Sequence, residues 1–229
     1  MQIILEKKIL LKVMEKITPT KKEILTEKKF AQKLISRIMA MRGAHKKAEL
    51  VGSLARGTHL RGDNDLDIFV FFPDSLAREK FEREGLRIGK AVFRGHEWEK
   101  AYSEHPYIRG QISGFEVEIV PAYLIERAEN LKSAVDRSAL HNRYLLAHFS
   151  AGQQDEVRLL KQFMKGVKCY GADLSTNSFP GYVAEILVLN YGTFGNVIRA
   201  AAGWEPGEVI DIENYWNTKD AMKKFGTHF

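Results

Sequence analysis

The sequence predicts a mixed α/β fold followed by a helical segment. A strand, a Gly-Ser turn, a helix and a second strand follow one another between residues 49 and 72. Three short strands separated by turn residues lie between 98 and 120, and from about residue 140 the pattern is helical. We therefore expect an α/β (α+β) domain with a mixed or antiparallel sheet and flanking helices at 1–139. We also expect a helical domain at 140–205 and the start of a following domain at 206–229.

The N-terminal residues have the apolar spacing of two helices. Ile3–Lys16 is the first expected helix, and Thr18-Pro19 ends it. Thr20 and Glu23 have the spacing of a capping box that opens the second helix, which is expected to extend to about Gly43.

The remaining elements follow from local pattern and from turn residues. Glu49–Val51 is an expected strand, and Pro73 ends a second strand at Asp65–Phe72. Asp74 is the expected cap of a helix that extends to about Phe93. An antiparallel meander is expected for Trp98–Ser103, Tyr107–Ser113 and Phe115–Val120. The later expected helices are Ser138–Phe149, Gln153–Lys168, Pro180–Tyr191 and Phe194–Ala202, the last one capped by Thr193.

Composition excludes several classes of protein. The chain has 229 residues, 45% hydrophobic and 28% charged, which is ordinary globular usage and excludes a wholly disordered chain. The longest apolar run, Ile68–Pro73, is far too short to cross a bilayer, so no membrane partner is expected. Cys169 is the only cysteine, which excludes an internal disulfide and a Cys-rich metal site and fits the reducing cytoplasm.

Positive charge is concentrated at the N-terminus. The formal net charge is +6, and residues 1–47 contain thirteen Lys and Arg against four Glu. Such an excess fits a polyanionic partner such as nucleic acid. A lysine-rich helix face that is simply solvated explains it equally well.

The segment between residues 51 and 67 combines a phosphate-binding pattern with a metal-binding pattern. Gly52 lets the backbone approach a ligand closely, and Ser53 and Arg56 place a hydroxyl and a cation in the first turn of a helix. Asp65 and Asp67 lie two apart at the start of a strand, so both carboxylates share one face. A hard divalent ion, Mg²⁺ for preference, would relieve their repulsion. Separately these patterns are usually a turn and a solvated loop, whereas together they are much more specific.

These residues resemble the nucleotidyltransferase signature of the DNA polymerase β superfamily. The likeness to archaeal, class I CCA-adding tRNA nucleotidyltransferases is closer and extends from about residue 45 to 205. It is carried by Val51–Thr58, Asp67–Pro73, His105–Tyr107, Ser133–Arg137, Glu156–Lys161 and Tyr170–Ala172. This resemblance implies a polymerase β-like palm (the head) followed by a helical, nucleotide-binding neck.

The resemblance also implies a reaction and its participants. The 3′-hydroxyl of tRNA would attack the α-phosphate of CTP or ATP, and pyrophosphate would leave, with two Mg²⁺ ions at the carboxylates. The family's third metal-binding carboxylate is an aspartate, and the matching residue here is Glu118. Because Glu116 lies on the same strand face, spacing alone leaves it as an alternative. Triphosphate and ribose contacts carry over to His141, Lys161 and Tyr170.

Members of this family continue beyond the equivalent of residue 229, with an Asp-x-x-Arg-Asn segment and RNA-binding domains. We find no such segment, so the chain resembles the head and neck alone. It would then be a truncated piece, one half of a split enzyme that needs a second chain, or a short natural form. Two other functions stay open. One is a minimal nucleotidyltransferase acting on another RNA or on a protein, and the other is an inactive RNA-binding subunit.

Overall fold

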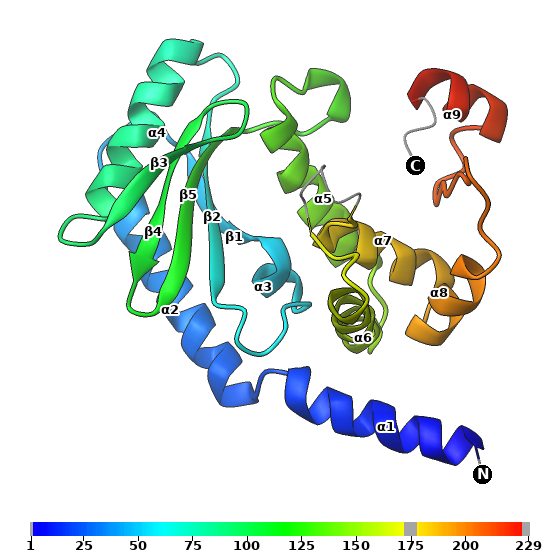
Figure 1. Ribbon diagram of the computed structural model, residues 1–229. Helices are drawn as coiled ribbons and strands as arrows, with labels where there is room; N and C mark the ends of the chain where they lie inside the picture. Colours follow the sequence, from blue (N-terminus) through cyan, green and yellow to red (C-terminus); the bar gives the residue numbers. More distant parts are fainter. Residues whose placement is uncertain (1, 172–177, 226–229) are drawn as a thin grey trace. The chain divides into compact units, whose positions relative to one another are not determined.

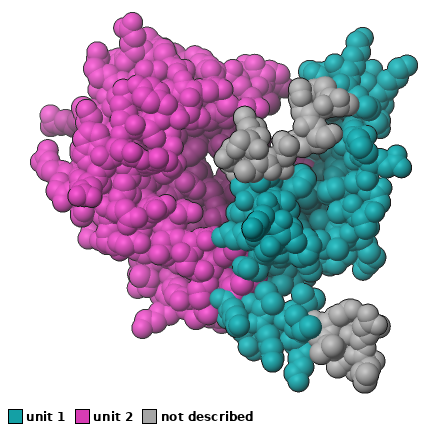
Figure 2. Space-filling model, in the orientation of Figure 1, with its two compact units in different colours: residues 1–16, 149–229 teal, residues 17–148 magenta. Residues whose placement is uncertain are grey.

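The computed structural model describes residues 2–171 and 178–225, and the chain divides into two compact units (Figure 1). One unit consists of residues 17–148, and the other combines residues 1–16 with 149–229, as Figure 2 shows. The domain boundary expected at 139–140 lies inside helix α5 (Ala134–His148) and stays a prediction.

Unit 17–148 is built on a five-stranded mixed sheet with the strand order β1-β2-β5-β4-β3. The two central strands, β2 and β5, are parallel, and the other neighbours pair antiparallel. The strands are β1 (Lys47–Val51), β2 (Asp65–Phe72), β3 (Trp98–Tyr102), β4 (Pro106–Ile112) and β5 (Phe115–Tyr123). The expected mixed α/β class is confirmed, and so is the meander formed by β3, β4 and β5.

Alternating side chains of β2 divide the core of this unit into two layers. Ile68, Val70 and Phe72 pack in a cluster with apolar residues of α2 (Lys21–Met39) and α4 (Arg78–Val92). Phe69 and Phe71 belong to a second cluster with residues of α5. The period of two along the strand therefore places Asp65 and Asp67 on the face that α5 covers.

The predicted start of α2 is confirmed, and that of α4 is wrong. Thr20 and Glu23 form the complete capping box of α2. Helix α4 begins at Arg78 instead of following Asp74 directly, because the Leu76 amide closes a turn onto the Pro73 carbonyl, 3.0 Å away. This turn lets the partly buried Leu76 pack against the core.

Further element ends differ from prediction, among them the start of α5, which begins at Ala134 instead of Ser138. Helix α2 ends at Met39, short of residue 43, and there the Ile38 carbonyl accepts a hydrogen bond from the Met41 amide at 3.0 Å and lies 3.1 Å from Nε2 of His45. Ser113 lies outside β4, since it forms a two-residue hairpin turn with Gly114, and both have positive φ. Strand β5 continues past its expected end at Val120 and includes Pro121. Proline has no N–H group, but the pairing of β5 with β4 already stops at Ile119, so no hydrogen bond to β4 is lost at Pro121.

The second unit is helical. Its core joins apolar residues of its consecutive helices, among them Val157, Leu160, Leu187, Val188 and Val197. Thr193 caps the helix that follows it, as predicted, by accepting a hydrogen bond from the Asn196 amide. The helices are α1 (Gln2–Ile17), α6 (Gln153–Gly166), α7 (Gly181–Tyr191), α8 (Phe194–Ala201) and α9 (Thr218–Phe225). Across residues 2–171 and 178–225, no helix has the length and apolar character needed to cross a membrane.

Candidate active site

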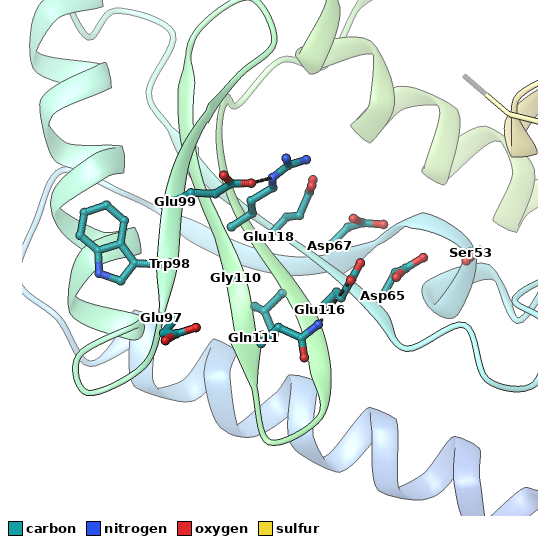
Figure 3. Close-up of a pocket in the computed structure, with 12 residues that line it drawn as sticks. Ser53, Asp65, Asp67, Glu97, Trp98, Glu99, Gly110, Gln111, Glu116 and Glu118 are labelled. Carbon is teal, nitrogen blue, oxygen red and sulfur yellow. Dashed lines mark hydrogen bonds and ion pairs between the residues drawn. The ribbon is translucent and has the colours of Figure 1, made fainter. Parts of the chain in front are cut away.

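Four carboxylates meet where the parallel strands β2 and β5 lie side by side. The register pairs Asp65 with Glu116 and Asp67 with Glu118, so the four side chains form two rows on one face of the sheet (Figure 3). They line a cavity of about 730 Å³ that also includes Ser53. The structure therefore brings the predicted residues Ser53, Asp65, Asp67 and Glu118 together.

Gly52 makes room for one of these carboxylates. It ends β1 and begins the short helix α3 (Gly52–Arg56) with φ +75°, a conformation that favours glycine. A Cβ atom added at Gly52 would lie only 2.0 Å from Oδ2 of Asp67. The Gly-Ser turn and the Asp67 carboxylate are therefore in direct contact.

The clustered charges change how the carboxylates hold protons. Burial, together with the charges of Glu118 and Asp65, raises the pKa of Asp67 to about 7, although the Arg56 cation opposes this shift. Burial also raises the pKa of Glu118, while a hydrogen bond from Tyr107 and the charge of Arg109 oppose that increase. The carboxylates of the site thus repel one another when ionised, and a bound cation would relieve this repulsion.

Strand β4 supplies two neighbours of Glu118 that sequence reasoning missed. The Tyr107 hydroxyl donates a hydrogen bond to Oε1 of Glu118 at 3.4 Å. Arg109 lies beside Glu118 in the register, and its Nε donates to Glu99 of β3 at 2.6 Å. Tyr107 lies in the resemblance motif His105–Tyr107, which gave it no role at the site. The only sequence signal for Arg109 was the alternation of β4, which does not show which strand pairs with it.

The donor set fits a hard divalent cation. Carboxylate oxygens are the preferred protein ligands of such ions, and the raised pKa of Asp67 reflects its burial and, in addition, the negative charge of its neighbours. Within the described part of the chain, no three His, Cys, Asp or Glu side chains already converge as a metal site. Binding would therefore require these carboxylates to turn toward a shared ion.

Arg56 places positive charge beside the carboxylates, and His141 lies near it within unit 17–148. Nη1 of Arg56 donates to Oδ1 of Asn142 at 3.0 Å, which ties the end of α3 to α5. Burial lowers the pKa of the adjacent His141, and the charges of Arg137 and Arg56 lower it further. A cation at the end of the helix that begins with the Gly-Ser turn suits an anionic ligand such as a phosphate.

The other two predicted nucleotide contacts lie in the helical unit and are close to each other. A Cβ atom at Gly181, the first residue of α7, would lie 2.9 Å from the Tyr170 hydroxyl and 3.6 Å from Nζ of Lys161. Lys161 is almost fully buried, and its Nζ lies 3.8 Å from Oε1 of Glu185. Residue 172, the end of the resemblance motif that begins at Tyr170, falls outside the described residues.

Metal-free protein should lose stability as pH rises from about 4 to about 7. Because the folded pKa of Asp67 lies above its ordinary 3.8, the folded state binds this proton more tightly than the unfolded chain. Deprotonation therefore disfavours folding, at about 1.4 kcal/mol per pKa unit at most. In thermal unfolding with a chelator, Asp67→Asn should gain stability over wild type between about pH 5 and about pH 8. Asp74→Asn, in an exposed turn, is the control, and equal profiles for all three proteins would contradict this expectation.

Two protein-family patterns match the chain, one in each part. The nucleotidyltransferase domain family matches residues 32–141. The second domain of tRNA nucleotidyltransferases matches residues 155–228.

Curated relatives share extensive sequence identity with this chain. The CCA-adding enzyme of Methanosarcina acetivorans is 42% identical over 207 residues, which cover 88% of this chain and 45% of that enzyme. The CCA-adding enzyme of Methanocaldococcus jannaschii is 37% identical over 232 residues, which cover 96% of this chain and 52% of the relative. The chain thus spans about half the length of these relatives.

Solved structures share the fold at low sequence identity. A cytoplasmic RNA terminal U-transferase has a TM-score of 0.59 at 18% identity, over 80% of this chain and 52% of the other. CdnC from E. coli MS115-1 with ATP has a TM-score of 0.62 at 17% identity, over 93% and 76%. The arrangement of strands and helices around the carboxylates therefore recurs in distant proteins.

Proposed function

Because this chain belongs to the nucleotidyltransferase superfamily, and because archaeal CCA-adding enzymes match most of it at 37–48% identity, we propose that it carries out nucleotidyl transfer in tRNA CCA addition. The reaction forms a bond between the tRNA 3′-oxygen and the α-phosphate of CTP or ATP. The bond from that phosphorus to the bridging oxygen of the β-phosphate breaks, and pyrophosphate leaves. The single observation that supports this most is the in-register pairing of Asp67 with Glu118 beside Ser53.

Each predicted residue has a part in this proposal. Asp65, Asp67 and Glu118 hold Mg²⁺, which when bound lowers the pKa of the attacking hydroxyl and balances the charge that grows on pyrophosphate. Ser53 and Arg56 orient the triphosphate, since positioning and charge stabilisation supply most of the rate in such transfers. His141, Lys161 and Tyr170 are the proposed further contacts to triphosphate and ribose.

The proposal also assigns parts of the chain. Residues 1–139 form the catalytic domain, 140–205 form the nucleotide-binding neck, and 206–229 begin a following domain. The proposed partners are tRNA and, in addition, a second chain or further domains that complete the RNA-binding site. The proposed place of action is the cytoplasm, in agreement with the single cysteine.

The direct test uses tRNA that lacks its terminal CCA. The chain is incubated with this tRNA, CTP, ATP and Mg²⁺, and the extended 3′ ends are sequenced. We expect addition of C and A, with no extension when Mg²⁺ is chelated. Extension of unrelated RNA in preference to tRNA, or labelling of protein instead, would support a different nucleotidyltransferase, and the absence of any transfer would contradict catalysis by this chain.

RNA contact through α2 should make binding strongly dependent on salt. Lys22, Lys29 and Lys33 are exposed on one side of α2, whereas its two acids are engaged elsewhere: Glu23 with Thr20 and Arg61, and Glu27 with His59. Each lysine that contacts a phosphate releases counterions on binding.

Replacing Lys22, Lys29 and Lys33 together by glutamine should therefore weaken tRNA binding and reduce the salt slope by about 1 for each phosphate that is no longer neutralised. The matched control replaces the exposed Lys80, Lys90 and Lys100, which changes net charge equally. A filter-binding salt titration with tRNA and an RNA of equal length measures both. Equal slopes for the two triple variants would mean that the α2 lysines are only solvated.

A further inference from the structure

Asn142 joins the end of helix α3 to helix α5. Its side chain is 8% exposed, and its Oδ1 accepts the hydrogen bond from Nη1 of Arg56 at 3.0 Å across 86 residues of sequence. We infer that Asn142 is a positioning residue, which holds the Arg56 guanidinium ready for the nucleotide phosphates. This inference rests on the proposed function, because it takes Arg56 as a phosphate contact.

The bond to Asn142 adds to the support that the short helix α3 gives Arg56. Helix α3 has only five residues, and Gly57, at φ +70°, ends it directly after Arg56. An arginine side chain has several rotatable bonds, and fixing it on ligand binding costs entropy. A hydrogen bond made before the nucleotide arrives removes part of that cost.

Helix α5 is a firm support for this bond. The Asp136 carboxylate accepts hydrogen bonds from the amides of Tyr123 and Ser133, at 2.8 and 2.9 Å, which fixes the first turn of α5 to the end of β5. Val135 and Ala139 then pack against Phe69 and other residues on the sheet face that carries the carboxylates. Asn142, one turn further along the helix, is thereby held relative to β2.

The chemistry of an amide suits this task better than that of a carboxylate. An asparagine oxygen accepts a hydrogen bond without carrying a charge, so the guanidinium keeps its full attraction for phosphate. An aspartate would hold Arg56 at least as firmly but would offset its positive charge. Asn142 thus combines orientation with retention of charge.

The test is a double-mutant cycle on nucleotide binding. Equilibrium dissociation constants for CTP and ATP are measured without RNA for wild type, Asn142→Ala, Arg56→Ala and the double variant, and kcat and KM are measured alongside. Loss of a hydrogen bond to a charged group predicts that Asn142→Ala weakens CTP binding about tenfold and raises KM more than it lowers kcat. In the Arg56→Ala background, the same change should cost less than about twofold.

Two further variants separate orientation from folding and from charge. Arg143→Ala removes a bond from α5 to the Ile125 carbonyl, 2.7 Å away, without touching Arg56, and should leave CTP affinity within about twofold. Asn142→Asp keeps an acceptor and the side-chain shape, so it should fold, yet it should bind CTP several-fold more weakly. Thermal unfolding of each variant checks the fold.

The outcomes distinguish this inference from the proposed function. If Arg56→Ala leaves CTP affinity unchanged, the role proposed for Arg56 in nucleotide binding is wrong. If Arg56→Ala weakens binding while Asn142→Ala does not, only the positioning inference is overturned. It is also overturned if Asn142→Ala costs the same in both backgrounds, or if Asn142→Asp binds CTP as wild type does.

Discussion

Asp67→Ala should reduce nucleotide addition at least about 10³-fold, and Asp65→Ala should have a similar effect, because a metal-assisted transfer loses several kcal/mol of stabilisation without a ligand. Asp67 has the stronger structural support, since it lies against Gly52 and beside Glu118, and burial together with the neighbouring negative charges raises its pKa to about 7. A single-turnover extension assay on tRNA that lacks CCA measures the loss.

The fold should survive this change, since removing one of several clustered carboxylates relieves repulsion in the metal-free protein. Glu97→Ala is the matched control, because Glu97 lines the same cavity but directly precedes the edge strand β3 and lies on neither β2 nor β5 (Figure 3). Circular dichroism should show all variants folded. Turnover at the wild-type rate in Asp67→Ala would remove the basis for a metal-dependent site on this face.

Glu118→Gln should lower activity about 10²-fold or more, and Glu116→Gln should lower it less than about tenfold, because a neutral amide is a poor ligand for Mg²⁺. The sequence left both residues as candidates. In the structure, Glu118 lies beside Asp67 and receives the Tyr107 hydroxyl, whereas the exposed Glu116 lies beside Asp65 and accepts a hydrogen bond from Gln111.

The comparison of these two variants in one extension assay decides between the residues. Glu118→Asp is the conservative control, and it should retain more activity than Glu118→Gln because the charge is kept. Losses in the reverse order would move the proposed ligand to Glu116. Equal losses would mean that both carboxylates contribute.

Local signals were sufficient to predict most elements of the fold. The apolar run that ends at Pro73 identified β2, the capping box at Thr20 identified the start of α2, and turn residues separated the strands of the meander. Prediction failed where an element end depends on contacts distant in sequence. Asp74 could have capped α4 by its chemistry, but the packing of Leu76 against the core favoured a turn instead.

The candidate site was predictable in its residue types and less so in its arrangement. Two carboxylates with period two must share a strand face, so the grouping of Asp65 with Asp67 required no tertiary information. The parallel pairing that adds Glu118 joins segments about fifty residues apart, and no local pattern specifies it. The bond from Arg56 to Asn142 is likewise invisible in sequence, because it depends on how two helices pack.

The close contact between the Asp67 carboxylate and Gly52 restricts the movement of both residues. Oδ2 of Asp67 occupies the space where a side chain at residue 52 would begin, so neither group can shift far without displacing the other. The turn proposed to hold the triphosphate and the carboxylate proposed to hold the metal are therefore mechanically coupled. A turn of the Asp67 carboxylate toward an ion would press on the Gly52 backbone, so the distance between phosphate and ion depends on both groups together.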